Sequence, residues 1–331
     1  MRRTIALLTA IVIIVLSAWL FIENWAGRAV MLDSPVTVLV ERGEGFTAIG
    51  RRLNTNGIVD SARLLTARAL MRDLTGSMKA GEYRFVGKHS PDRVLDRLAS
   101  GDVLVYSIQI TEGETFSDTR NKLLSSPGLL FDLDDATVVN ILERLELADD
   151  HGEGQFFPDT YHYVRGDRAS EILGRAWERL QLQLNIAWEN RAIDLSLKSP
   201  YEVLIMASII EKESNLEDDR RKISGVFGRR LGRGMRLQTD PAVIYGLGET
   251  FDGNLTRVDL KKDGPYNTYT RYGLPPSPIG AVGRTALHAA THPDSGTALY
   301  FVARGDGSSQ FSDTLDAHLK AVRQYQLRDD Q

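Results

Sequence analysis

Two carboxylates stand at the end of an unusually apolar stretch of the sequence. Residues 204–214 read LIMASIIEKES, so Glu211 and Glu213 follow a run that otherwise suits a hydrophobic core. Partial burial raises the pKa of a carboxyl group and can keep it protonated at neutral pH. A protonated carboxylic acid in a groove is what cleavage of a glycosidic bond requires of its general acid. The chemistry offered by this stretch is therefore proton donation by one of the two glutamates.

The helix expected around these glutamates hardly discriminates between them. Pro200 suits the first turn of a helix, and apolar residues then form a wide stripe along it. At about 100° per residue, the centre of this stripe lies about 70° from Glu213 and about 90° from Glu211. A plainer interpretation is that both glutamates are solvated and pair with Arg220 or Lys222. The pattern alone leaves both interpretations open.

Other catalytic chemistries lack the residues that they need. The chain has no cysteine, which removes disulfides, thiolate metal ligands and cysteine nucleophiles. His288 and His292 have the spacing of a zinc-binding helix, but Ala289 stands where that motif needs glutamate, and Pro293 follows at once. No G-x-S-x-G motif and no phosphate-binding glycine loop occurs in the sequence. We therefore expect neither a metal nor another cofactor.

The composition is that of a folded globular protein. The chain has 331 residues, of which 42% are hydrophobic and 25% charged, and its net charge is −4. This length predicts one large domain or two to three modest ones. Binding to nucleic acids relies on neutralising phosphates with positive charge, so no nucleic-acid partner is expected.

The N-terminus predicts a membrane anchor. Residues 5–22 form an uncharged run of 18 residues that follows Arg2 and Arg3 and precedes Glu23. That length is close to the minimum for crossing a bilayer, and the flanking charges place residues 1–4 in the cytoplasm and the rest of the chain outside it. A cleaved signal peptide is the alternative, but its apolar part is usually shorter and ends in small residues. We predict a retained single-pass anchor.

The region after the anchor contains a possible internal repeat. A short connector is expected from Ala26 to Pro35, after which VLVERGEGF at 38–46 resembles IQITEGETF at 108–116, seventy residues later. Each copy reads as a short strand, a Gly-Glu turn and a helix; a repeated unit and a coincidence between common units both remain open. A strand is predicted over 81–85, and helices are predicted over 61–72, from Ser90-Pro91-Asp92, over 134–147, over 170–187 and from Pro200.

An aromatic segment follows in the middle of the chain. Residues 152–161 read GEGQFFPDTY, and this mixture of glycine, proline and aromatic residues predicts a loop. The rings could stack on sugars, or the loop could pack its own aromatic side chains into the core. Composition does not separate these two interpretations.

Several longer segments carry a resemblance to a known family. They are GMRLQTDP at 234–241, VIYGLG at 243–248, YNTY at 266–269, GLPPSPI at 273–279, ASIIEKE at 207–213 and FPDT at 157–160. Together they closely resemble the endolytic murein transglycosylases, also called the YceG-like or MltG family. The Glu213-Ser214 pair also resembles the Glu-Ser signature of lytic transglycosylases in general. The resemblance extends from the anchor to Tyr325.

The resemblance implies an architecture and a setting. It implies an α+β protein with a single N-terminal transmembrane helix, a LysM-like α+β subdomain at 36–105 and a mixed α/β catalytic domain at 106–331. It also implies a single-pass protein of the cell inner membrane whose body lies in the periplasm and cleaves nascent peptidoglycan glycan strands, with peptidoglycan synthases as possible partners.

The resemblance further implies which residues act. The family's catalytic glutamate is the second of the Glu-Lys-Glu triplet, which corresponds to Glu213. One carboxylate can suffice, because the C6 hydroxyl of N-acetylmuramic acid attacks its own C1 and leaves a 1,6-anhydro end, and this intramolecular attack avoids the cost of positioning a separate nucleophile. Candidates for binding the substrate are Ser214, Gln238, Asp240, Tyr245, Asn267 and Tyr269.

Each of these assignments has an alternative. Asp240 could cap a helix, or it could be a second catalytic carboxylate and make the enzyme a hydrolase that uses water. Asn267 could bond the backbone of a turn, and Ser214 could satisfy the backbone at the helix end. At the level of the whole chain, a non-catalytic peptidoglycan-binding scaffold that recruits cell-wall synthesis proteins is the alternative function.

Overall fold

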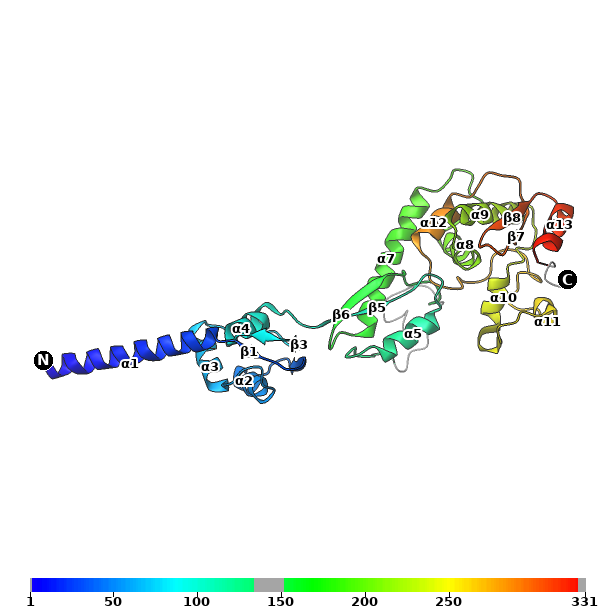
Figure 1. Cartoon of the computed structure of the whole chain (residues 1–331). Coiled ribbons are helices and arrows are strands. Elements are labelled where there is room, and N and C mark those ends of the chain that lie inside the picture. Colours follow the sequence, from blue (N-terminus) through cyan, green and yellow to red (C-terminus); the bar gives the residue numbers. More distant parts are fainter. Residues whose placement is uncertain (1, 134–151, 327–331) are drawn as a thin grey trace. The chain divides into compact units, whose positions relative to one another are not determined.

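The computed structural model describes residues 2–133 and 152–326 and divides the chain into two compact units. Both units combine helices with two-stranded sheets (Figure 1), so the predicted α+β class is confirmed. The helix expected over 134–147 lies outside the described residues. Unit 1 comprises Met1–Tyr106, Pro127–Leu130 and His162–Asp167, and unit 2 comprises Ser107–Ser126, Phe131–Tyr161 and Arg168–Gln331.

Unit 1 is a small α+β body behind a long apolar helix. Strands β2 and β3 pair antiparallel, with Val38 opposite Tyr83, and the inward side chains of both strands are buried. As predicted, Ser90 caps a helix by accepting a hydrogen bond from the Arg93 N–H at 3.4 Å, with Pro91 in the first turn. The elements are α1 (Arg2–Gly27), β1 (Val30–Met31), β2 (Val36–Val40), α2 (Phe46–Thr55), α3 (Ala62–Met71), β3 (Gly81–Phe85), β4 (Lys88–His89) and α4 (Pro91–Ser100).

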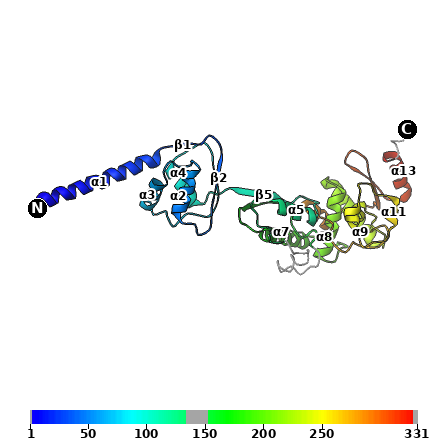
Figure 2. The same cartoon turned by 90° about the horizontal axis from the view of Figure 1, so that it is seen from below.

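The end of α1 is part of the core of unit 1. The helix is long and apolar enough to cross a membrane, and it extends beyond both ends of the predicted 5–22 segment. Trp25 and Ala26 are buried, and the Trp25 indole N–H donates to the Asp60 carboxylate at 2.7 Å. The connector expected from Ala26 to Pro35 is therefore wrong in its first part, because helix and then β1, which pairs with β4, occupy it (Figure 2).

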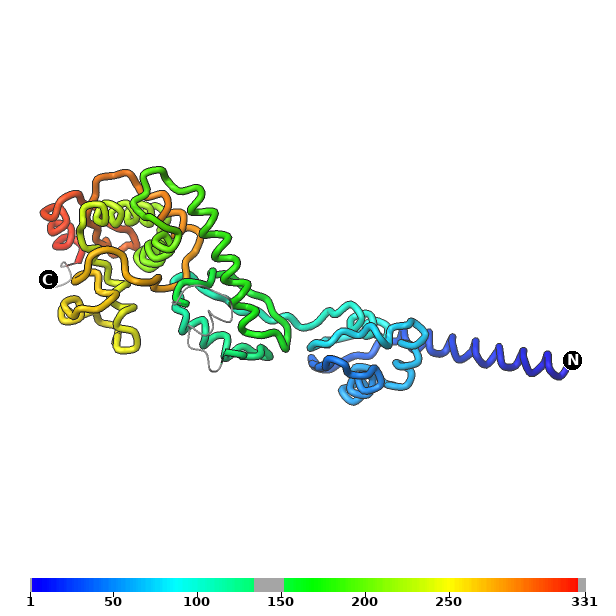
Figure 3. Tube along the Cα trace, turned by 180° about the vertical axis from the view of Figure 1, so that it is seen from behind, coloured from blue at the N-terminus to red at the C-terminus, as the bar shows by residue number. Residues whose placement is uncertain are grey.

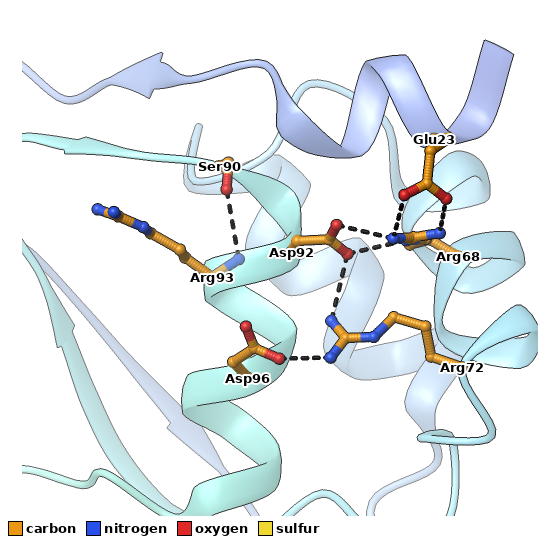
Figure 4. A network of polar contacts seen from close by, with 7 residues as sticks. All are labelled: Glu23, Arg68, Arg72, Ser90, Asp92, Arg93 and Asp96. Carbon is orange, nitrogen blue, oxygen red and sulfur yellow. Dashed lines mark hydrogen bonds and ion pairs between the residues drawn. The ribbon is translucent and has the colours of Figure 1, made fainter. Parts of the chain in front are cut away.

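An ion-pair network fixes α1 to the two helices beneath it. Figure 4 shows the Arg68 guanidinium of α3 between Glu23 of α1 and Asp92 of α4. The Arg68 nitrogens lie 2.8 and 2.9 Å from the Asp92 oxygens. Arg72 adds a bond of 3.2 Å to Asp92 and one of 2.6 Å to Asp96. Because Asp92 is shared between both arginines, α3, α4 and the end of α1 are held as one body.

The two similar segments form the same local structure. In each copy a glycine of positive φ, +78° in the first and +74° in the second, is followed by a glutamate. That carboxylate accepts the backbone N–H three residues earlier, at 3.1 Å in the first copy and 2.9 Å in the second, and pairs with a basic residue of the following helix. The repeated unit is therefore present in the structure. Equivalent residues are Gly43 and Gly113, Glu44 and Glu114, Arg52 and Lys122, and Leu53 and Leu123.

Unit 2 is built around α8. This helix is buried on all sides from Val203 to Glu211, and α7, α9, α10 and α12 pack against it (Figure 3). Two two-stranded sheets, β5 with β6 and the antiparallel pair β7 with β8, complete the described elements, and the division between the units falls within the first of these sheets. The elements are β5 (Val105–Gln109), α5 (Phe116–Ser125), β6 (Thr160–Val164), α7 (Ala169–Glu189), α8 (Pro200–Glu213), α9 (Glu217–Gly232), α10 (Asp240–Leu247), the 3₁₀ turn η1 (Gly248–Thr250), α11 (Arg257–Lys261), α12 (Arg284–Thr291), β7 (Tyr300–Ala303), β8 (Ser309–Ser312) and α13 (Leu315–Tyr325).

Candidate active site

Helix α8 carries both glutamates of the apolar stretch to one edge of the core. Its first turn is fixed by the Ser199 hydroxyl, which accepts from the Glu202 N–H at 3.2 Å, and by Pro200. Its last residue is Glu213, after which Ser214 is extended, with a φ of −153°. The helix therefore ends where its carboxylates leave the apolar core, which explains the abrupt change in the sequence.

Glu211 is a buried structural carboxylate. It forms an ion pair with the equally buried Arg220 of α9 and accepts the Gly283 N–H at 2.9 Å. Burial raises its pKa, while the bonds from Gly283 and Arg220 oppose that rise. The expected pairing with Arg220 is confirmed for this glutamate, but its expected solvation is wrong. Its oxygens are occupied in joining α8, α9 and the segment before α12.

Glu213 lies at the margin of the same core with part of its surface accessible. Its Oε1 accepts a hydrogen bond from the Thr239 hydroxyl at 2.5 Å. Burial raises the pKa of Glu213 to about 7; the negative charge of Asp240 also raises it, whereas the Thr239 hydroxyl and the buried Arg230 lower it. A carboxyl with a pKa near 7 is populated in both protonation states at neutral pH, so it can donate a proton and later accept one.

The segment that faces Glu213 is held by Thr268 in a neighbouring loop. The Gln238 N–H donates to the Thr268 carbonyl at 3.1 Å, and the Thr239 N–H donates to the Thr268 hydroxyl at 2.9 Å. Gln238 has a φ of +52°, in the left-handed region that costs an ordinary side chain about 1–2 kcal/mol. The side chain of Gln238 is exposed. This geometry turns the chain so that the Thr239 hydroxyl points at the glutamate.

Asp240 and Tyr269 form a second polar pair beside Glu213. The Tyr269 hydroxyl donates to Asp240 Oδ1. Burial, the hydrogen bond to Asp240 and the charge of Glu213 all raise the pKa of Tyr269, so its hydroxyl stays protonated. The alternative of Asp240 as a helix cap is wrong, because the helix begins at Asp240 itself and Thr239 occupies the capping position without a side-chain bond.

Three further candidates have other positions. The Ser214 hydroxyl accepts the Leu216 N–H at 3.1 Å, which is the backbone role considered for it. Asn267 is buried and donates to the carbonyls of residues 259, 260 and 262, while its side-chain oxygen accepts the Tyr269 N–H at 2.9 Å, so it shapes the loop that presents Tyr269. Tyr245 lies on α10 and bonds to a different glutamate, Glu153.

Glu153 is the acidic residue that the sequence interpretation missed. It is 9% exposed, its carboxylate accepts the Phe116 N–H at 3.0 and 3.2 Å, and the Tyr245 hydroxyl donates to it at 3.1 Å. Burial raises its pKa to about 7. Its signal in the sequence was a lone charged residue between two glycines, directly before an aromatic run.

Glu153 lines a cavity of about 710 Å³ beside α10, which we name the α10 cavity. The aromatic segment that contains Glu153 does not present its rings, because Phe156, Phe157 and Tyr161 are all buried. The interpretation that this loop packs its aromatic side chains into the core is confirmed. Residues lining the α10 cavity include Thr115, Glu153, Lys212, Pro241, Tyr245 and Tyr266.

Metal ligation has no support among residues 2–133 and 152–326. No group of three histidine, aspartate or glutamate side chains there is arranged to hold an ion. His288 and His292 stack on each other with ring centroids 4.4 Å apart, at the end of α12. The ionisable groups near α8 and α10 include carboxyl, hydroxyl and guanidinium groups and the ammonium group of Lys212.

The fold agrees with that of similar proteins. The sequence model of the YceG-like family matches residues 38–324, and the chain belongs to that family. It is 32% identical over 313 residues to the endolytic murein transglycosylase of Bacillus subtilis, covering 88% of this chain and 86% of that protein. The resemblance stated from the sequence motifs is thereby confirmed.

Two further comparisons extend this result. An endolytic murein transglycosylase of Streptococcus pneumoniae is 25% identical over 325 residues, which cover 88% of this chain and 58% of that longer protein. The crystal structure of a YceG-like protein from Listeria monocytogenes superposes with a TM-score of 0.54 at 27% identity, covering 87% of this chain and 99% of the other.

Proposed function

We propose that this protein is an endolytic peptidoglycan transglycosylase in which Glu213 is the sole general acid and base. The observation that carries the proposal is the Glu213 carboxyl itself, partly accessible at the end of a buried helix, with a pKa of about 7. The names of the relatives from Bacillus subtilis and Streptococcus pneumoniae support the reaction class. No cofactor takes part in the proposed reaction.

The proposed reaction has two proton transfers through one carboxyl. Protonated Glu213 donates its proton to the glycosidic oxygen as the bond from that oxygen to C1 of N-acetylmuramic acid breaks. The resulting carboxylate then takes the proton of the C6 hydroxyl of the same sugar while O6 bonds to C1. Glu213 ends protonated, no water is consumed, and the product is a 1,6-anhydro end. The nucleophile is already part of the substrate, which avoids the entropic cost of positioning a second reactant.

The geometry of Glu213 suits this exchange. The Thr239 hydroxyl holds Oε1, while among the described residues no protein group donates to Oε2. We assign Oε2 to the proton transfers and Oε1 to orientation of the group. Asp240, held by Tyr269, keeps a negative charge close to Glu213 and would favour the positive charge that develops on the sugar ring.

The remaining candidates take supporting roles in the proposal. The exposed Gln238 side chain is available to bond the glycan directly. Asn267 and Ser214 act through the backbone, since they position the Tyr269 loop and the end of α8. Tyr245 belongs to the α10 cavity.

The proposed setting follows from α1. We place α1 in the inner membrane as a single-pass anchor, with residues 1–4 in the cytoplasm and the chain that follows α1 in the periplasm. Residues 36–105 would be a LysM-like subdomain and residues 106–331 the catalytic domain. Nascent glycan strands are the proposed substrate, and peptidoglycan synthases are the proposed neighbours.

Mass spectrometry of the products tests the proposal. The full-length protein, its Glu213→Gln variant and its Asp240→Asn variant are incubated with purified peptidoglycan. We expect 1,6-anhydro-N-acetylmuramic acid ends from the unaltered protein and none from Glu213→Gln. Reducing ends that vanish with Asp240→Asn would instead identify a hydrolase with two carboxylates, which the proximity of Asp240 to Glu213 makes the second candidate. No release from the folded, unaltered protein would favour the scaffold.

A further inference from the structure

The α10 cavity adjoins the proposed catalytic carboxyl. Lys212, which precedes Glu213 in α8, and Pro241, which follows Asp240 in α10, both line it. The cavity is therefore lined by the sequence neighbours of Glu213 and Asp240. Its volume of about 710 Å³ is in the range of sites that hold small organic ligands. Every residue that lines it belongs to unit 2.

The lining combines an apolar platform with a few polar groups. The rings of Tyr245 and Tyr266 meet edge to face, with centroids 4.8 Å apart, and Ile244 and Ile279 add aliphatic surface. Aromatic and aliphatic surface of this kind suits the C–H faces of a sugar ring. The polar groups at hand can bond hydroxyl and amide groups.

The charges of the lining disfavour a strongly charged ligand. Lys212 is cationic, while Asp118 and Glu249 are anionic, and all three lie at the same cavity. An acidic peptide would meet two carboxylates, and a basic one would meet the lysine. A neutral ligand with hydroxyl and amide groups meets neither penalty.

Glu153 is oriented before any ligand arrives. Its oxygens accept from the Phe116 N–H at the start of α5 and from the Tyr245 hydroxyl. The turn before α5 is itself fixed, because the Gly113 N–H donates to the Ala281 carbonyl and the Ala281 N–H donates to the Glu114 carbonyl, both at 2.8 Å. Burial raises the pKa of Glu153 to about 7, so at neutral pH this group can either donate to or accept from a ligand.

We propose that the α10 cavity is a subsite for a neutral N-acetylated amino sugar of the glycan strand, with Glu153 bonding its hydroxyl or acetamido group and Tyr245 supporting its ring. This assignment rests on the proposed function in that the substrate is taken to be a glycan. It adds a binding residue, Glu153, and a sugar class to that function. The subsite is distinct from the reacting bond, since Glu213 does not line the cavity.

A binding titration tests the subsite without requiring catalysis. The full-length protein in lipid nanodiscs is titrated calorimetrically with the β-1,4-linked tetramer of N-acetylglucosamine, which has no peptide. Ile244→Trp places a large side chain at the cavity, and Ile193→Trp makes the same change at a fully exposed position of unit 2. We expect Ile244→Trp to weaken binding at least tenfold, about 1.4 kcal/mol, and Ile193→Trp to leave it unchanged.

A second, more conservative variant tests the subsite in case Ile244→Trp fails to fold. Tyr245→Phe keeps the ring and removes only the hydroxyl that bonds Glu153, so we expect a several-fold loss of binding in a protein that stays folded, with a melting temperature lowered by only a few degrees. Equal affinity of the tetramer for the unaltered protein and both cavity variants would overturn the subsite. An absence of saturable binding of the tetramer would also overturn the subsite. The same holds if free stem peptide displaces the tetramer from the unaltered protein but not from Ile244→Trp.

The two proposals can fail separately. Glu213→Gln should bind the tetramer as the unaltered protein does, because Glu213 is not part of the cavity. If that variant still released anhydro ends while Ile244→Trp lost the tetramer, the catalytic role of Glu213 would fall and the subsite would stand. If Glu213→Gln lost cleavage while Ile244→Trp bound the tetramer normally, the catalytic role of Glu213 would stand and the subsite would fall.

Discussion

Removal of one hydroxyl should move the pH dependence of cleavage in a defined direction. Thr239 is buried, and its hydroxyl donates to Glu213 Oε1, which lowers the pKa of that carboxyl against the effect of burial. Thr239→Val keeps the shape of the side chain and removes the donor. The pKa of Glu213 should therefore rise above about 7.

The size of the pKa change follows from the free energy of one hydrogen bond. A bond to a charged group contributes about 1.5–3 kcal/mol, which corresponds to about one to two pKa units. The hydroxyl also stabilises the protonated carboxyl to a smaller extent, so we expect the pKa of Glu213 to rise by about one unit. Because the first step of the proposed reaction needs protonated Glu213, kcat/KM of the unaltered protein should fall as pH rises through about 7, and in Thr239→Val this fall should occur about one pH unit higher.

The assay is the initial rate of release of anhydro ends from peptidoglycan between about pH 5 and about pH 9. The matched control is Thr291→Val, which makes the same substitution at a buried threonine whose hydroxyl bonds only within and next to α12. The control should keep the profile of the unaltered protein. If the rate of Thr239→Val falls at the same pH as that of the control, the decrease in rate at high pH does not report the pKa of Glu213, and the assignment is refuted.

Further predictions concern the neighbouring groups. Asp240→Asn removes a charge that raises the pKa of Glu213, so the fall in rate measured in the same way should move to lower pH. The folded pKa of Glu213, about 7, exceeds its ordinary value of 4.5, so protonation of this carboxyl stabilises the fold, and this stabilisation is lost as the pH rises from 4.5 through about 7. Glu213→Gln lacks this pH dependence, so its free energy of unfolding relative to that of the unaltered protein should rise by about 3 kcal/mol from about pH 4 to about pH 8, measured by urea titration. Glu211→Gln leaves its buried arginine partner unpaired and should cost about 3–5 kcal/mol of stability, measured by thermal unfolding. Arg68→Ala should speed amide hydrogen exchange at the end of α1, about tenfold for each 1.4 kcal/mol of lost docking energy.

Much of the fold was predictable because its signals are local. The helix that begins at Pro91 has its cap, proline and apolar spacing within a few residues, and the strand over 81–85 has simple alternation. The connector after Ala26 was mispredicted because the residues that bury Trp25 and Ala26 come from α3 and α4, much later in the chain.

The site was predictable only in part, for a related reason. Periodicity hardly separated Glu211 from Glu213, since the difference lies in partners such as Gly283, 72 residues from Glu211. The family motifs singled out Glu213, but they predicted no role for Thr239 or Glu153. Glu153 takes its hydrogen bonds from residues 37 and 92 positions away, so its local pattern, a glutamate between two glycines, could not reveal its partners.

The docking of α1 has a mechanical consequence. Helices in bilayers adjust their tilt to match the thickness of the hydrocarbon layer. Because Glu23 and Trp25 fasten α1 to α3 and to Asp60, a change of tilt cannot be absorbed at the junction and must turn unit 1 with it. With α1 as the proposed membrane anchor, a thicker or thinner bilayer would therefore reorient the rest of unit 1.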